Sequence, residues 1–261
     1  MVPRISRVLT AVICMVAAPL VAQDKPARLT FEVASVKPSP PGGRGGGIRA
    51  QPSGQRYSAQ NAPVKLMISL MYKVPMRQIT GGPGWIESDL FDIEAKADHS
   101  YSLDDLHAMF ENLLADRFKL KFHKESKEGA VYALSVDKSG SKMKVNDSPE
   151  PYDIPIKGSR DGVTLGTRVP MQYFCWWLGQ VLQRDERPVI DKTGLTGNYD
   201  FTLSFAPELP PDFPKENLPP GFLDRPSIFD ALREQLGLRL QPQKGPVEFF
   251  VIDSAEKPTG N

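Results

Sequence analysis

Three histidines and Cys175 are the residues whose types could bind a metal or serve as a nucleophile and its base. His99, His107 and His123 follow neither His-x-x-x-His nor His-Glu-x-x-His spacing, and Cys175 lies far from them in the chain. Zinc sites are usually built from closely spaced ligands of this kind. The sequence therefore predicts solvated surface histidines, no metal site and no cofactor.

Candidate catalytic groups each have a structural explanation. Cys175 lies in the apolar run Phe-Cys-Trp-Trp, which favours a buried small hydrophobe over a thiol nucleophile. The adjacent acids Asp104 and Asp105 stand at a predicted helix start, where they complement the helix dipole. The sequence singles out no catalytic residue, although an acid pair drawn from distant segments stays open.

The tryptophans are the candidates for a binding surface. Trp85 follows a Gly-Gly-Pro-Gly turn, whereas Trp176 and Trp177 lie within an apolar helical run. Packing is the ordinary role of such side chains, and recognition of a peptide, sugar or partner is the alternative. Trp85 is the strongest candidate because loop positions more often carry binding. Trp176 and Trp177 are weaker candidates, for which packing is favoured.

The N-terminus has the pattern of a secretory signal peptide. Arg4 and Arg7 precede the apolar stretch Val8 to Val21, and Ala22 offers a small residue for cleavage. The stretch is short for a membrane span. We expect residues 1–22 to be removed, the protein to be exported to the periplasm or the cell exterior, and no stable membrane insertion afterwards.

The charge and cysteine content of residues 23–261 exclude several classes of protein. Without Arg4 and Arg7 the chain has 30 basic against 31 acidic residues, which is not the footprint of a nucleic-acid binder. Cys175 is then the one cysteine left, so no intramolecular disulfide can form. Stability must come from a hydrophobic core.

The elements follow one plan that occurs twice. Gly54 to Pro63 leads into the apolar helical run Val64 to Val74, and Gly162 to Pro170 leads into Met171 to Leu182. Pro170 suits the first position of its helix. A Gly-containing turn and a short strand follow each run. Such repetition predicts one supersecondary unit used twice.

Each copy then adds a second helix and a pair of strands. The pattern Ser-x-x-Asp, at Ser102 and again at Ser227, predicts two helix N-termini. The strands after them are predicted to form hairpins, which pair Phe118–Phe122 with Val131–Val136 and Leu238–Leu240 with Val247–Ile252. The predicted fold class is α+β, internally duplicated, with four helix-strand-strand units whose helices pack on antiparallel sheets.

Proline-rich segments set the predicted domain boundaries. Residues 23–145 form the first α+β half, 146–162 a connector, and 163–261 the second half. Residues 207–226 contain seven prolines and are predicted to be an extended insertion in the second half.

Five ordered motifs resemble the soil-associated family, enriched in acidobacteria, that is built on domain of unknown function 3738. The likeness covers nearly all of residues 23–261, and it implies a bacterial exported protein without an established activity. A similar domain attached to a membrane peptidase of the antibiotic-sensor type favours sensing or binding. The motifs are Phe31–Pro38, Ile79–Ile86, Leu114–Lys121, Val189–Asp200 and Pro246–Asp253.

The functional expectation is a non-enzymatic envelope or secreted module that binds an envelope protein, a peptide or another envelope ligand. Trp85, the duplicated plan and the lack of a catalytic motif support it. The alternatives are a hydrolase acting on cell-wall or plant-derived polymers, a sensor-type ligand-binding domain, and a purely structural envelope protein. A deep pocket with two close acids would favour the hydrolase.

Overall fold

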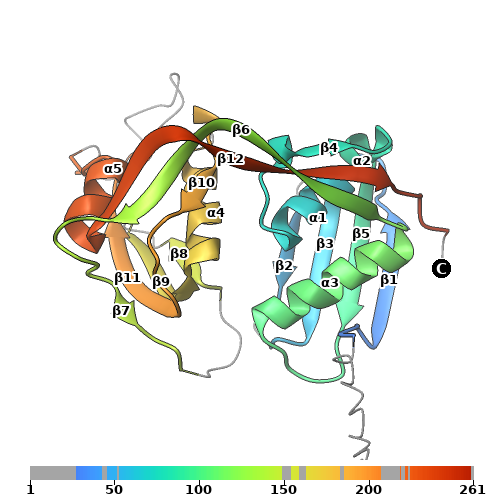
Figure 1. Cartoon of the computed structure of the whole chain (residues 1–261). Helices are drawn as coiled ribbons and strands as arrows, with labels where there is room; N and C mark the ends of the chain where they lie inside the picture. Colours follow the sequence, from blue (N-terminus) through green and yellow to red (C-terminus); the bar gives the residue numbers. More distant parts are fainter. Residues whose placement is uncertain are drawn as a thin grey trace, which may run out of the picture.

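A computed structural model describes residues 28–42, 46–51, 53–148, 154–158, 163–182, 185–206, 218, 221–222 and 224–259. It has helices packed on sheets that are mostly antiparallel, so the fold is α+β. Two lobes lie side by side under a long two-stranded ribbon (Figure 1). The predicted signal peptide lies outside the described residues, as does most of the proline-rich segment 207–226.

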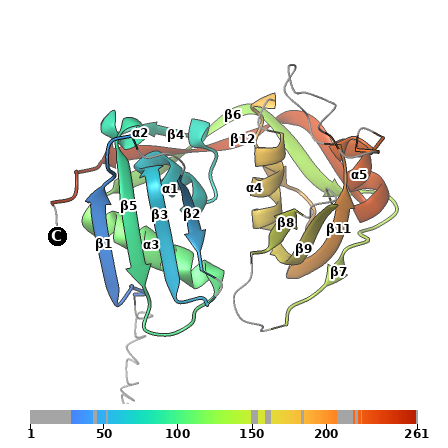
Figure 2. The same ribbon diagram turned by 180° about the vertical axis from the view of Figure 1, so that it is seen from behind.

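The first lobe is a four-stranded antiparallel sheet with helices on one face (Figure 2). Along β5 the residues alternate between buried and exposed, which leaves a single apolar face to cover. Helices α1 and α3 pack on that face. The sheet order is β1-β5-β3-β2, with β1 at Val33–Pro38, β2 at Gly47–Ala50, β3 at Arg56–Pro63 and β5 at Leu90–Lys96, while α1 spans Val64–Met71 and α3 Leu103–Arg117.

The predicted start of α3 is confirmed. The hydroxyl oxygen of Ser102 accepts a hydrogen bond from the backbone N–H of Asp105 at 3.1 Å. The same cap occurs in the second lobe, where Ser227 accepts from the N–H of Asp230 at 3.2 Å. Short polar side chains at this position satisfy backbone donors that the helix itself leaves free.

The second lobe has its own four-stranded antiparallel sheet and helices. Helix α4 begins at Met171, and Pro170 precedes it with an extended backbone, so Pro170 is the N-cap and not the first helical residue. The sheet order is β7-β11-β9-β8, with β7 at Lys144–Val145, β8 at Ile156–Gly158, β9 at Val163–Pro170 and β11 at Asn198–Ser204, while α4 spans Met171–Val181, α5 Ile228–Ala231 and the π-helical turn η4 Leu232–Leu236.

The ribbon replaces both predicted hairpins. Strand β6 runs unbroken over Lys121–Val136, and β12 runs over Leu238–Ser254. The two pair antiparallel along nearly their whole length. The hairpin prediction was wrong because Gly129 and Gly245, which read as turn residues, lie opposite each other where the ribbon crosses between the lobes.

The ribbon forms the centre of a third sheet, and two short strands complete it. Strand β4 at Ile79–Gly81 pairs parallel with β12 in the first lobe, and β10 at Val189–Asp191 pairs parallel with β6 in the second. The sheet order is β10-β6-β12-β4. The helical turn η1 at Met76–Gln78 precedes β4, and the short helix α2 at Trp85–Ser88 follows it.

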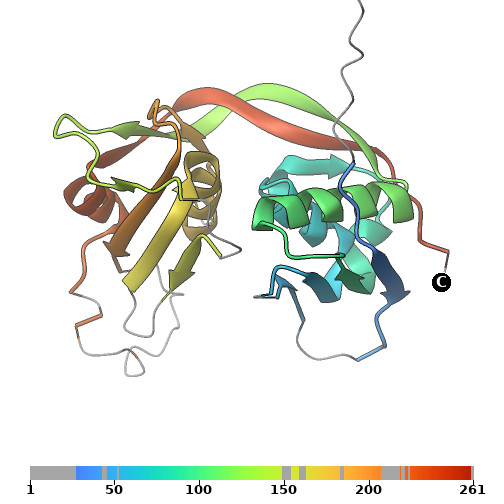
Figure 3. The same cartoon turned by 90° about the horizontal axis from the view of Figure 1, so that it is seen from below.

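The described core falls into two hydrophobic clusters, one in each lobe. Phe110, Phe118 and Ile93 belong to the first cluster, which also takes Phe250 and Ile252 from the far end of the chain. The second cluster includes Phe174, together with Tyr132 and Leu134 of the ribbon. The ribbon thus contributes apolar side chains to both cores. Seen from below, the ribbon runs from one lobe to the other (Figure 3).

Candidate binding cleft between the lobes

A cavity of about 290 Å³ lies under the ribbon, where the two lobes meet. We call it the ribbon cavity. Its walls come from three sources, so it forms only when both lobes and the ribbon are in place. The first lobe supplies Tyr72 to Pro75 and Gln78, the second lobe Gln172, Cys175, Trp176, Gly179 and Pro188 to Asp191, and the ribbon Lys124, Pro246 to Glu248 and Phe250.

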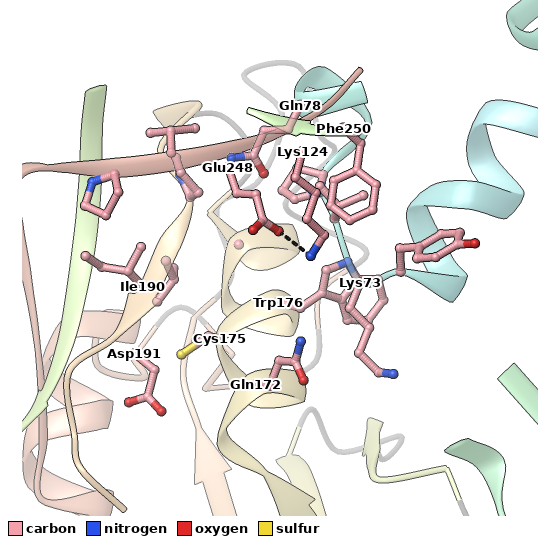
Figure 4. A pocket seen from close by; sticks show the side chains of 18 residues that line it. Lys73, Gln78, Lys124, Gln172, Cys175, Trp176, Ile190, Asp191, Glu248 and Phe250 are labelled. Carbon is pink, nitrogen blue, oxygen red and sulfur yellow. Dashed lines mark ion pairs between the residues drawn. The ribbon is translucent and has the colours of Figure 1, made fainter. Parts of the chain in front are cut away.

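The roof of the ribbon cavity presents an ion pair. Lys124 and Phe250 are register partners, so their side chains leave the ribbon on the same face, and Glu248 lies two residues from Phe250 on that face. The Lys124 ammonium lies 3.0 Å from the Glu248 carboxylate and 4.8 Å from the centroid of the Phe250 ring. Figure 4 shows both charged groups directed down toward Trp176.

Helix α4 supplies the facing wall. Because α4 is apolar on one side and packs on the second core, the residues on its other side are left at the cleft. Gln172 and Trp176, one helical turn apart, both line the ribbon cavity. The indole Nε1 of Trp176 is buried and has no hydrogen-bond partner among the described residues.

A second, smaller cavity of about 150 Å³ lies beside strand β2. We call it the β2 cavity. It too has walls from both lobes, and Trp176 borders it as well as the ribbon cavity. Its lining residues are Ile48, Arg49, Ala50, Tyr57, Leu70, Leu103 and His107 of the first lobe, with Ile154, Tyr173 and Trp176 of the second.

His107 corrects the expectation of solvated surface histidines. Its side chain is 8% exposed, and its Nε2 lies 3.1 Å from the Tyr57 hydroxyl. Burial, with a smaller contribution from the Lys73 charge, lowers the pKa of His107 to about 4, so the ring is neutral at pH 7. Its other nitrogen, Nδ1, is buried without a partner among the described residues. His99 and His123, by contrast, are more than half exposed.

Two potentially reactive groups beside the ribbon cavity are held in their protonated forms. Burial, with the charge of Asp191, raises the pKa of the Cys175 thiol to about 12. Burial, with the charge of Glu111, raises the pKa of the Tyr72 hydroxyl to about 12. A thiolate is the nucleophilic form of cysteine, so Cys175 is a weak nucleophile in this environment.

The other two candidate tryptophans lie away from the two cavities. Trp85 begins the short helix α2, is partly buried against the first core, and has ring contacts with Phe91 and Phe118. Trp177 points into the second lobe, where its ring stacks on Phe174 with centroids 5.8 Å apart. The three tryptophans therefore lie at three separate places.

Sequence reasoning missed most of the cleft. Lys124, Glu248 and His107 come from segments that are distant in the chain, and no short motif connects them. The alternation of apolar and charged residues around Lys124 was a usable signal for one ribbon face. Its value was hidden by the predicted hairpin of Phe118–Phe122 with Val131–Val136.

Among the residues that the structure describes, no group of three or more His, Cys, Asp or Glu side chains is arranged to hold a metal ion. None of the described helices combines the length and the apolar character that a membrane crossing requires.

The family model described as "Protein of unknown function (DUF3738)" matches residues 65–255. That span is well over half of the chain. It includes the elements of the second lobe and the whole ribbon, whereas strands β1, β2 and β3 of the first lobe precede it. The chain belongs to this family. No curated protein and no solved structure matches it.

Proposed function

We propose that this chain is an exported, non-enzymatic binding protein that holds a short peptide in the ribbon cavity. The observation that carries the proposal is the composition of the cavity wall. Lys124 and Glu248 offer one cation and one anion, and Trp176 offers a large apolar face. Pockets for small ligands combine apolar walls with a few well-placed polar groups in the same way.

The polar groups match the chemistry of a peptide. Gln78 and Gln172 both line the cavity, and each carboxamide has a donor and an acceptor for a peptide N–H or C=O. The half-exposed Lys124–Glu248 pair gains little for stability, about 0–1 kcal/mol, so its charges can be shared with peptide termini. A cavity of about 290 Å³ suits a di- or tripeptide.

The test is calorimetric titration of residues 23–261 with a set of di- and tripeptides whose termini are free or blocked. At least one free peptide should bind. Lys124→Gln and Trp176→Phe should each weaken it about tenfold, because a charged hydrogen bond or an aromatic contact is lost. Trp177→Phe, next in the chain but packed in the second core, is the matched control and should leave affinity unchanged.

Two outcomes would count against this function. One is the absence of binding by every peptide in the set. The other is a bound peptide whose affinity is the same in the Lys124→Gln and Trp176→Phe variants as in the unaltered protein. Blocked peptides that bind as well as free ones would show that the charged pair is not used.

Export and the soil-associated, acidobacterial origin are part of the same proposal, supported by the sequence pattern of residues 1–22 and by the five motifs of the family resemblance. N-terminal sequencing of the protein recovered from a bacterial envelope should begin at Gln23. Recovery of a chain that still starts at Met1 would contradict cleavage after Ala22.

We also infer that the two lobes descend from an internal duplication, the predicted repeat of helix-strand-strand units, in which β3 and α1 correspond to β9 and α4. The sheet orders β1-β5-β3-β2 and β7-β11-β9-β8 support it, because β3 and β9 lead directly into α1 and α4 and are each paired with β5 or β11. An experimental structure whose lobes do not superpose in this order of elements would contradict it.

A further inference from the structure

We propose that the β2 cavity is a second ligand site, which binds a small carboxylate with a single ring or a short branched chain. This site is separate from peptide binding in the ribbon cavity and does not depend on it. The two cavities share Trp176, but the other residues that line them are different.

Two ring nitrogens, one from each lobe, lack hydrogen-bond partners among the described residues at this cavity. His107 and Trp176 both line the β2 cavity, and each has a buried nitrogen with no partner among the described residues. An unpaired buried polar group is costly, and native proteins rarely keep two of them together without a role. A ligand carboxylate that accepts one hydrogen bond from each ring nitrogen would satisfy both groups.

The tautomer of His107 allows this arrangement. Nε2 lies within hydrogen-bond distance of the Tyr57 hydroxyl, so a neutral ring that accepts there carries its proton on Nδ1. Trp176 Nε1 is a donor only. Two N–H donors from the two lobes then meet the two oxygens of one carboxylate.

The charge of the wall favours an anion. Arg49 is the single charged residue among the described residues that line the β2 cavity, and none of those described residues is acidic. Arg49 is exposed on β2, at the solvent side of the cavity, where its guanidinium can pair with the carboxylate of the bound ligand. A carboxylate is favoured over a neutral alcohol for this reason.

The size and the mostly apolar lining of the β2 cavity limit the rest of the ligand. Ile48, Leu70 and Leu103 from the first lobe face Tyr173 and Ile154 from the second across about 150 Å³. An apolar cavity of this volume accommodates about one benzene ring. The bound molecule is thus an aromatic or branched aliphatic acid with its carboxylate between the two lobes.

The ring nitrogens are shielded from solvent in this conformation, so entry requires a small separation of the lobes. The ribbon allows such a movement, since Gly129 and Gly245 face each other at the crossing and have no side chains to resist bending. Ligand binding then closes the lobes on the carboxylate.

Titration of residues 23–261 with benzoate, benzyl alcohol and benzamide tests the site, with calorimetry as the readout. Benzoate should bind at least about tenfold more tightly than benzyl alcohol. Arg49→Gln, an exposed change that should not affect folding, and Trp176→Phe should each weaken benzoate about tenfold or more. Lys124→Gln, which alters only the ribbon cavity, should leave benzoate affinity unchanged.

Three results would overturn the proposal. They are no benzoate binding, equal binding of benzoate and benzyl alcohol, and full benzoate affinity in both Arg49→Gln and Trp176→Phe proteins that melt at the normal temperature. The two proposals fail separately, because Lys124→Gln tests the peptide site alone and Arg49→Gln tests the carboxylate site alone.

Discussion

His107 is a buried side chain that affects the stability of the protein and also lines the β2 cavity. It is buried beside Tyr57, with the two ring centroids 5.7 Å apart, yet it keeps a polar nitrogen at the lobe boundary. Burial is the main cause of its lowered pKa, the Lys73 charge lowers the pKa further, and the Asp104 charge raises it by less. His107 therefore gives the folded protein a pH dependence that originates in burial, whereas the pKa of the exposed His123 is raised by its hydrogen bonds to Asp253 and Glu125.

Because of His107, the stability of the folded protein should fall as the solution is acidified. The unfolded chain binds a proton on His107 below about pH 6.5, whereas the folded protein binds it only near pH 4. The unfolded state holds the extra proton in this window, so stability is full above pH 6.5 and declines toward pH 4. Between pH 6.5 and 5 we expect a loss of about 2 kcal/mol from this group.

Urea unfolding at about pH 6.5 and about pH 5 measures this loss of stability, with the His107→Phe variant for comparison. That variant keeps an aromatic ring beside Tyr57 but cannot titrate, so its stability should change less over the window. The control His99→Gln, at an exposed position, should behave like the unaltered protein. The same pH dependence in His107→Phe would assign the effect to other groups.

At the scale of elements, the end of the last helical segment depends on one glycine. Gly237 follows η4 with φ at 66°, in the left-handed region, and β12 starts at the next residue. A Cβ at this position would collide with the carbonyl oxygen of Gly140. Only glycine allows the chain to turn from the helix directly into the ribbon.

Gly237→Ala should therefore destabilise the protein by about 2 kcal/mol or more, since left-handed strain adds to a backbone clash. The matched control is Gly84→Ala. Gly84 has φ at −58° and open space around its Cβ position, so this change should cause no loss. Thermal melts of both variants make the comparison. Equal melting temperatures would show that the turn can rearrange.

At the scale of the molecule, the ribbon makes the two lobes interdependent. Phe250 lies far from the first lobe in sequence, yet it is 3% exposed in the first core and stacks near Phe122 and Tyr72. The first lobe therefore cannot complete its core until β12, which follows the whole second lobe, has been added. Phe249, the next residue, faces the other side of the ribbon and is only partly buried.

Phe250→Ala should cost about 3–5 kcal/mol, because a large buried ring is replaced by a cavity. The loss should appear in the first lobe, as faster hydrogen exchange of amides in α3 and β5. Phe249→Ala removes the same ring from the outer face and should cost clearly less. Faster exchange confined to the second lobe in Phe250→Ala would contradict the assignment of this residue to the first core.

The sequence by itself determined the local elements of this protein. Alternation in β5, the Ser102 cap and the glycine at position 237 act over a few residues, so their physics can be read without a fold. The α+β class follows from these elements. Membership of the family also rests on the sequence.

Only the tertiary structure decided the ribbon and the cleft. Gly129 and Gly245 resemble turn residues locally, but pairing over sixteen residues of β6 outweighs that preference. A local pattern does not indicate that a strand will pair with another more than a hundred residues away in the chain. The same holds for His107, Lys124 and Trp176. Their spacing along the chain carries no signal, because the two lobes bring them to one boundary only after both have folded.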